Sequence, residues 1–328
     1  MLVFIGKRLL MLIPILLGIS IIVQVLIDIT PGDPVMVMLG GQATQEEMDE
    51  VRERLGLNDS LPVRYVRYMR GVLQGDFGRS LVSNRPVFDE MATRFPYTLL
   101  LVALSISLSI LIGIPVGVYA ATHQNTWRDN ASMFVALFCV SMPSFWFGLM
   151  LIQQFAVRWR WLPVAGGGSW NGWVLPIVSM ALGITSTIAR QTRSNMLEVT
   201  RQDFVTTARA KGLGEGRIRY RHALKNAMIP VVMVIGNLFG SLLGGSLIAE
   251  VIFSLPGLGQ YTIQGLRNRD YPIIQSSVLI LSVLFAIVIL LVDIMFALID
   301  PRIRSQYTRK STRGKNKKKG VILIEKDA

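Results

Sequence analysis

The sequence has 328 residues, of which 51% are hydrophobic and only 17% charged, and its mean hydropathy is +0.46. An average soluble domain has about 25% charged residues, so this composition argues against a soluble enzyme and against intrinsic disorder. One cysteine (Cys139) and two histidines (His123, His222) argue against an intramolecular disulfide and a histidine-rich metal site, while the net charge of +13 leaves a basic membrane protein as the class to test.

Six apolar stretches are long enough to cross a bilayer, whose hydrocarbon core takes about 20 residues of helix. The predicted spans are Leu9–Ile29, Tyr97–Ala121, Ala131–Val157, Trp173–Ala189, Met228–Ile252 and Ser276–Ile299. The first stretch is too long for a signal peptide and lacks a small-residue cleavage site, so we expect residues 1–30 to remain as an N-terminal transmembrane helix. The sequence therefore predicts an all-α integral membrane protein.

Lysine and arginine residues set the expected orientation, because they collect in short cytoplasmic loops. On one side of the membrane lie Lys7, Arg8, Arg128, a basic stretch from Arg190 to Lys225 and a basic tail after Pro301. The two short loops on the other side hold Arg158, Arg160, Arg267 and Arg269. Both termini are therefore expected in the cytoplasm, and the positive charge needs no nucleic-acid partner.

Residues 31–96 are expected to form an extracytoplasmic helical segment. Thr44 and Glu47 fit a capping box, and Gly56 stands where a helix would end in the left-handed conformation. A second helix is predicted after Ser60, with Pro62 in its first turn and an apolar face. That face consists of Tyr65, Val66, Met69 and Leu73, which we expect to be buried. We expect a lid packed on the membrane domain in preference to a dedicated ligand site.

Residues 97–300 are expected to form the membrane domain, with a long cytoplasmic loop at 190–226. Asp203 is predicted to cap a short helix over Phe204–Lys211, which Gly212 ends. At 1.5 Å per residue this helix is about 12 Å long, too short to be stable alone.

This short helix is suited to docking into a groove of another protein. Thr207, Ala208 and Ala210 are small and allow close approach, whereas Arg209 and Lys211 place positive charge near the helix C-terminus. The alternative is an amphipathic helix that lies on anionic lipid head groups.

Several motifs then occur in a fixed order along the chain. They are Thr207-Ala208-Arg209-Ala210-Lys211-Gly212, Arg221-His222-Ala223-Leu224-Lys225-Asn226-Ala227 with Pro230, Pro31-Gly32-Asp33-Pro34, Gly75-Asp76-Phe77-Gly78-Arg79-Ser80, Phe253-Ser254-Leu255-Pro256-Gly257-Leu258-Gly259, Arg269-Asp270-Tyr271-Pro272 and Asp300-Pro301-Arg302. Together they resemble the permease subunits of binding-protein-dependent ABC importers, in the oligopeptide, dipeptide and nickel branch, and the first two resemble that family's EAA loop.

The resemblance implies a type I importer (MetI-like) transmembrane domain with an extracytoplasmic insertion after the first helix. It also implies that Thr207 to Leu213 form a coupling helix in a cleft of a cytoplasmic ATPase. The implied partners are a second, similar permease, two P-loop ATPases that hold ATP and Mg²⁺, and an extracytoplasmic substrate-binding protein. Thr206 and Thr207 replace the Glu-Ala of the broad family pattern, and His222 and Lys225 replace its Ile and Pro, so contacts of that Glu are not transferred.

No phosphate-binding G-x-x-x-x-G-K-[ST] loop, nucleophile elbow or HExxH helix occurs in the sequence. We therefore expect a non-catalytic subunit that binds no cofactor and no metal. Pathway candidates in the spans are Asn237, Gly240, Gly244 and Gln153. For Asp28 and Glu250 we expect a capping or loop-pairing role, and for Asp293 a cation partner on the inner side. Gly236, Gly240, Gly244 and Gly245 have small-xxx-small spacing, which predicts close packing against a partner permease or the pore axis.

Residues 301–328 are expected to be a disordered basic tail attracted to anionic lipid. The function that the resemblance implies is import of short peptides, with nickel, metal chelates, opines or glutathione as alternative cargoes. A self-sufficient secondary transporter or channel is the competing class. Sparse intramembrane charges and the absence of visible inverted repeats argue against it.

Overall fold

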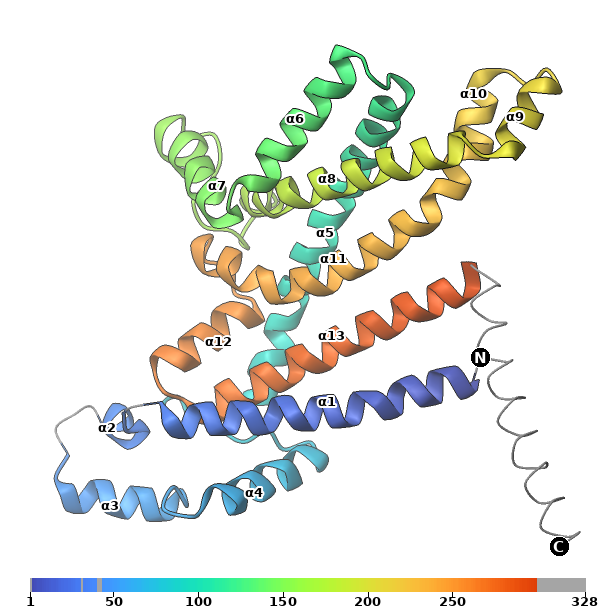
Figure 1. The fold of residues 1–328 in the computed structure, drawn as a ribbon. Coiled ribbons are helices and arrows are strands. Elements are labelled where there is room, and N and C mark those ends of the chain that lie inside the picture. The colour runs from blue at the N-terminus through green and yellow to red at the C-terminus, as the bar shows by residue number, and fades with distance from the viewer. Residues whose placement is uncertain (1, 31, 40–42, 300–328) are drawn as a thin grey trace, which may run out of the picture.

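The computed structural model describes residues 2–30, 32–39 and 43–299, and the predicted tail 301–328 lies outside them (Figure 1). Within these ranges the chain is helical, and its one β-bridge joins Arg79 and Pro86. The elements are α1 (Leu2–Ile29), α2 (Pro34–Met38), α3 (Gln45–Arg54), α4 (Leu61–Leu73), α5 (Val87–Thr122), α6 (Trp127–Ser141), α7 (Ser144–Leu151), η1 (Ile152–Arg158), α8 (Asn171–Thr200), α9 (Asp203–Ala210), α10 (Glu215–Arg217), η2 (Ile218–Ala223), α11 (Leu224–Ile252), α12 (Leu258–Arg267) and α13 (Tyr271–Ile299).

Five segments of the described chain are long and apolar enough to cross a membrane as single helices, and a bent helix pair brings the number to six. The single helices are Arg8–Ile29, Val87–Thr122, Asn171–Thr200, Glu215–Ile252 and Tyr271–Ile294. The all-α prediction is confirmed. The long helices also extend beyond the predicted ends, since α5 begins at Val87 and α8 continues to Thr200, so the first third of the predicted cytoplasmic loop is helix.

The third predicted span, Ala131–Val157, is wrong as a continuous helix. Helices α6 and α7 meet at an angle of 95°. Pro143 has no N–H to donate and disfavours helical backbone in the preceding residue. Met142 accordingly has an extended conformation with φ −82° and ψ 125°. The segment therefore turns back at Met142 and ends in π-helix η1, where the ring of Phe155 meets that of Trp159 edge-on and the rings of Trp159 and Trp161 are tilted against each other.

The centre of the membrane domain is the crossing of α5 and α8. Gly113 and Gly117 allow it, because a Cβ atom at these positions would lie 2.8 Å from the carbonyl oxygen of Thr185 and 2.5 Å from that of Ala189. Ser109 donates a hydrogen bond across the same contact to the carbonyl of Ala181 at 3.1 Å. Side chains of α7 and α11 complete the main hydrophobic core around this pair.

Helix α1 lies beside α13, with α3 and α4 on its other side (Figure 1). One face of α1 remains exposed, with Leu10 70% and Ile13 56% accessible, as expected for side chains in contact with lipid. Near the N-terminus of α1, Arg8 forms a 3.0 Å ion pair with Asp293. The prediction of a cation partner for Asp293 is therefore confirmed.

The outer segment forms the predicted pair of helices. The Thr44–Glu47 capping box begins α3, and Gly56 ends it with φ +64°. Helix α4 has Pro62 in its first turn, as expected, but its apolar face is only partly covered, with Tyr65 and Met69 half-buried. Val66 is 63% and Leu73 84% exposed, so the prediction that both are buried is wrong for this single chain.

Candidate functional site

The short helix α9 lies where the C-terminal end of α8 meets the N-terminal end of α11, and Figure 1 shows α9 and α10 projecting there from the rest of the chain. Its C-terminus is a Schellman motif. The amide of Gly212 donates to the carbonyl of Arg209 at 2.9 Å, and the amide of Leu213 donates to that of Ala208 at 3.2 Å. Gly212 has φ +76°, a conformation that glycine adopts without a Cβ penalty. The prediction that Gly212 ends this helix is confirmed.

Two local contacts hold α9 to the segment that follows it. Val205 and Ala208 face inward against Ile218, with Leu213 at the edge of the same small cluster. Arg209 then reaches across the turn and donates to Glu215 at 2.7 Å. These contacts supply the support that a helix of eight residues lacks by itself.

The surface that α9 offers to solvent differs in two respects from the sequence prediction. Asp203 is the first helical residue, and Gln202 occupies the N-cap without a side-chain hydrogen bond, so Asp203 is not the cap. Ala208 is buried and is not available to a partner. Of the predicted docking residues, Asp203, Thr207, Arg209, Ala210, Lys211 and Gly212 are exposed, and Phe204 and Thr206 are exposed beside them.

The inner ends of the helices around α9 are braced. Arg193 of α8 forms a bidentate ion pair with the buried Asp129 of α6, at 2.5 and 2.6 Å. The π-helix η2 continues directly into α11. The segment after α9 therefore continues without a break into the transmembrane helix α11, over Glu215–Ile252.

The pathway candidates fall on two different faces. Asn237 and Gly244 lie on an exposed face of α11, and Gln153 is exposed on η1. Gly240 is buried, and a Cβ atom there would lie 3.0 Å from the ring of Phe285 in α13. Gly236 likewise packs against Val292, so these two glycines serve contacts within the chain, whereas Gly244 and Gly245 face open space.

Glu250 of α11 has the loop-pairing role that the sequence predicts. Its carboxylate accepts hydrogen bonds from Thr98 of α5 at 2.7 Å and from the amide of Gln260 in α12 at 3.0 Å. Thr98 also accepts from the amide of Leu258 at 2.9 Å. A Cβ atom at Gly257 would lie 2.3 Å from the carboxylate, which explains the glycine of this motif. Nothing in the sequence near Thr98 indicates this role.

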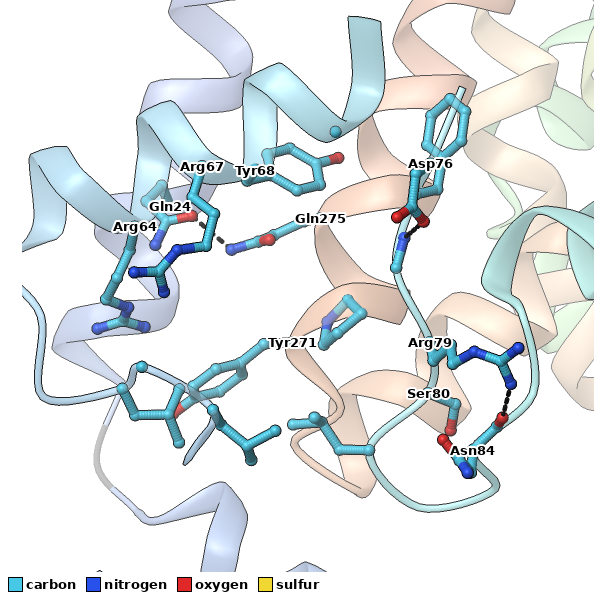
Figure 2. Close-up of a pocket in the computed structure, with 18 of the residues that line it drawn as sticks. Gln24, Arg64, Arg67, Tyr68, Asp76, Arg79, Ser80, Asn84, Tyr271 and Gln275 are labelled. Carbon is cyan, nitrogen blue, oxygen red and sulfur yellow. Dashed lines mark hydrogen bonds between the residues drawn. The ribbon is translucent and has the colours of Figure 1, made fainter. Parts of the chain in front are cut away.

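The outer segment encloses a pocket of about 610 Å³ between α4, the loop after it and the start of α13 (Figure 2). Figure 2 shows Arg64 and Arg67 on the α4 side and Arg79 on the opposite wall. Gln24 of α1 and Gln275 of α13 are hydrogen-bonded to each other in the wall between them. Asp28, outside the pocket, pairs with Arg64 at 2.6 Å, which confirms its loop-pairing role.

Three of the sequence motifs meet around this pocket. Ser80 donates to the buried carboxylate of Asp270 at 2.5 Å. The guanidinium of Arg269 occupies the space that a Cβ atom would fill at Gly32. Ser276, four residues after the Arg269-Asp270-Tyr271-Pro272 motif, donates to the carbonyl of Phe77 at 3.0 Å. The outer motifs therefore form one contact network although they are far apart in the sequence.

The chain matches two protein families over most of its length. Residues 113–305 match the family "Binding-protein-dependent transport system inner membrane component", and residues 1–102 match the N-terminal family of the same system. The glutathione transport system permease protein GsiC of Salmonella paratyphi A is 43% identical over 304 residues, covering 93% of this chain and 99% of the relative. GsiC of Escherichia coli K12 is 41% identical with the same coverage.

Solved structures show the same fold at low identity. The inward-facing MetNI methionine ABC transporter superposes with a TM-score of 0.56 at 20% identity, covering 64% of this chain and 96% of the solved chain. An amino acid ABC transporter crystallised with histidines gives a TM-score of 0.52 at 16% identity, covering 64% and 94%. The MetI-like fold prediction is confirmed. The chain belongs to the inner membrane component family of binding-protein-dependent transport systems and is the permease subunit of an ABC importer.

Proposed function

We propose that this chain forms a heterodimer with a second, similar permease, on which two P-loop ATPases and one extracytoplasmic binding protein assemble. Its cargo is short peptides, with glutathione, a tripeptide, included. The glutathione permeases that are 41–43% identical over 93% of the chain support this cargo. The observation that carries the assembly is α9, an exposed and capped helix at the inner end of the membrane domain.

In this assembly α9 is the coupling helix and docks in a cleft of an ATPase. ATP and Mg²⁺ are bound and used on the ATPases, and this chain binds no cofactor and performs no catalysis. When the ATPases close, they displace α9. Because Arg209–Glu215 and the Val205–Ile218 contact join α9 to the segment that continues into α11, the displacement reaches the membrane helices.

The orientation follows from charge. Both termini, α9 and the Arg193–Asp129 brace lie on the cytoplasmic side, where lysine and arginine collect. The segment α2–α4 and helix α12 lie outside. The binding protein docks on this outer side.

The translocation pathway runs along the exposed face of α11. Asn237, Ser241 and Gly244 follow each other at helical spacing on that face, and the hydroxyl of Ser241 donates to the carbonyl of Asn237 at 3.1 Å. Small and polar groups on one exposed face suit a water-filled route. Gln153 on η1 is the outer candidate, whereas Gly240 acts through its packing against Phe285.

Reconstitution tests this proposal. Proteoliposomes that contain both permeases and both ATPases, supplied with the binding protein and ATP, are assayed for uptake of radiolabelled glutathione, dialanine and Ni²⁺. We expect ATP-dependent uptake of the peptides and none of the free metal. Uptake of nickel, a metal chelate or an opine without peptide uptake would assign the alternative cargo. Uptake without the ATPases would contradict the coupling role of α9.

A further inference from the structure

The pocket at the outer end of α1, α4 and α13 is not used by the coupling mechanism. Its volume of about 610 Å³ falls within the range of about 300–1,000 Å³ typical of small-molecule sites. Its walls come from five separate parts of the chain: the end of α1, the end of α2, α4 with the turn before it, the loop after α4, and the start of α13 (Figure 2).

Positive charge dominates the lining of the pocket. Arg64, Arg67 and Arg79 line it against a single carboxylate, Asp76, which accepts a hydrogen bond from the amide of Gly78 at 2.8 Å. A guanidinium has five N–H donors in a fixed fork, which matches the two oxygens of a carboxylate.

Each of the three guanidinium groups donates a hydrogen bond to a neighbouring acceptor of the protein. Arg64 donates through Nη1 to Asp28 at 2.6 Å, Arg67 through Nη2 to Asp59, and Arg79 through Nη1 to the carbonyl of Asn84 at 2.9 Å. These contacts use one nitrogen of each group and hold it in place. The other nitrogens remain as donors for a ligand.

A neutral donor lies between the charged walls. The hydroxyl of Tyr68 is buried and makes no hydrogen bond of good geometry among the described residues, although Ser276 lies close to it. Burial raises the pKa of Tyr68 to about 12, so the phenol keeps its proton at physiological pH. A buried donor without a partner costs free energy, and an acceptor on a ligand would remove that cost.

Much of the remaining surface of the pocket is apolar, although Gln24, Ser80, Asn84 and Gln275 also line it. Leu57, Phe77, Leu81 and Tyr271 line it alongside the arginines. Apolar walls with a few convergent donors suit an organic acid that has side chains of its own. A free inorganic anion would leave the apolar walls without a partner.

We propose that this pocket binds the carboxylate of an organic ligand the size of a di- or tripeptide, with Arg67, Arg79 and Tyr68 as the donors. The proposal rests on the proposed function, because a peptide that arrives from the outer side carries such a carboxylate. The pocket is then a receiving site on the outer surface of the permease, separate from the exposed face of α11.

Equilibrium dialysis of the intact membrane complex without its binding protein tests the site, with radiolabelled glutathione as the probe. Loss of a charge-assisted hydrogen bond weakens binding by about tenfold or more. We therefore expect Arg67→Met and Arg79→Met each to weaken glutathione binding by at least that factor, and Tyr68→Phe to weaken it by a smaller one. Glutathione diethyl ester, whose carboxylates are blocked, is expected to bind as weakly as glutathione binds the arginine variants.

Two controls keep the result interpretable. Arg70→Met removes the same charge from α4 at an exposed position that does not line the pocket, and it is expected to bind glutathione within about twofold of the unchanged protein. Leu81→Trp fills the pocket without changing its charge and is expected to abolish binding. Equal binding of the ester and the acid, or equal losses in Arg70→Met and Arg67→Met, would overturn the proposal.

Uptake by the reconstituted transporter separates the two proposals. Suppose that the unchanged protein takes up peptide normally and that Arg67→Met and Leu81→Trp bind glutathione normally. This result would overturn the proposed binding site and leave the proposed function intact. Absence of peptide uptake by the unchanged protein would overturn the proposed function. If the variants bind glutathione normally but lose stimulation by the binding protein, the pocket receives a segment of that protein, and the small-ligand proposal is wrong.

Discussion

The inner loop around α9 and the outer segment α2–α4 are both short helical pieces attached to the membrane domain, but they are held in opposite ways. All contacts described for α9 lie within residues 202–218, as in the Arg209–Glu215 pair and the Gly212 motif. The outer segment is held by contacts between residues far apart in the sequence. Tyr65 of α4 is hydrogen-bonded to Ser20 of α1 at 2.8 Å, Arg64 of α4 pairs with Asp28 at 2.6 Å, and the loop after α4 is tied to Asp270 through Ser80.

This difference bears on how each region works. A region closed by local contacts can move as a unit, because few bonds to the rest of the chain need to break. A region tied to three transmembrane helices moves only when those helices move. We therefore expect α9 to follow a partner protein, and the outer segment to report the state of α1, α5 and α13.

The largest effect is expected from breaking the long-range contacts at Glu250. Glu250→Ala leaves the hydroxyl of Thr98 and the amide of Gln260 without their acceptor in a buried site. We expect a loss of about 3 kcal/mol or more in the free energy of unfolding, measured by denaturant titration of the purified protein. Glu198→Ala, at an exposed position of α8, serves as the control and is expected to change stability by less than about 0.5 kcal/mol. Equal stability of both variants would contradict the role of Glu250 in joining α11 to α5 and α12.

A smaller loss of stability with a large loss of coupling is expected at Gly212. Gly212→Val forces a β-branched residue to φ +76°, at a cost of about 1–3 kcal/mol that α9 bears locally. We expect reduced stimulation of ATP hydrolysis by substrate-loaded binding protein. Gly214→Val is a matched control, because Gly214 has φ −63° and open space around its Cβ position. Unchanged coupling in Gly212→Val would show that the coupling assignment is wrong.

A more modest change is expected where the outer loop meets α13. Asp270→Asn weakens the acceptor of the Ser80 hydrogen bond, which we expect to cost about 1 kcal/mol. Amide hydrogen exchange of residues 79–86 should become faster while that of α9 stays the same. The exposed Asp89→Asn is the control. Faster exchange in both regions would mean that they are not independent.

The smallest effect is expected from the α3 capping box. The backbone and side-chain hydrogen bonds from Thr44 lower the pKa of Glu47 below its usual 4.5. This contribution to stability is present above pH 4.5 and is lost as the pH falls through the lowered folded-state pKa. Exchange protection of residues 45–54, corrected for intrinsic rates, should therefore fall below pH 4.5. Glu47→Gln should remove that dependence, and its persistence would assign the effect to another group.

The sequence predicts the features whose determinants are local. The capping box of Thr44, the turn at Gly212 and the positions of the long helices follow from short patterns. The bend at Met142 is only partly predicted, because Pro143 indicates a kink while the tertiary fold decides its angle. Asp203 is one residue from the predicted cap, an ordinary uncertainty of helix boundaries.

The outer contacts are not predictable in this way. Thr98 and Ser80 have no neighbouring residue that indicates their partners, since these lie 152 and 190 residues away. Val66 and Leu73 fit a buried helical face, yet both are exposed in the single chain. Helical spacing identifies an apolar face but does not identify what covers it.

Site-specific cross-linking shows whether α9, and not the outer segment, contacts an ATPase. In a Cys139→Ser background, a single cysteine is placed at Thr207 of α9 or at Val66 of α4, and a bifunctional thiol–amine reagent is applied to native membranes. If α9 docks in an ATPase, we expect Thr207→Cys to capture a P-loop ATPase, identified by mass spectrometry. We expect no such capture from Val66→Cys. Capture of the ATPase from the outer position, or none from α9 while the complex remains intact, would contradict the docking of α9 in an ATPase.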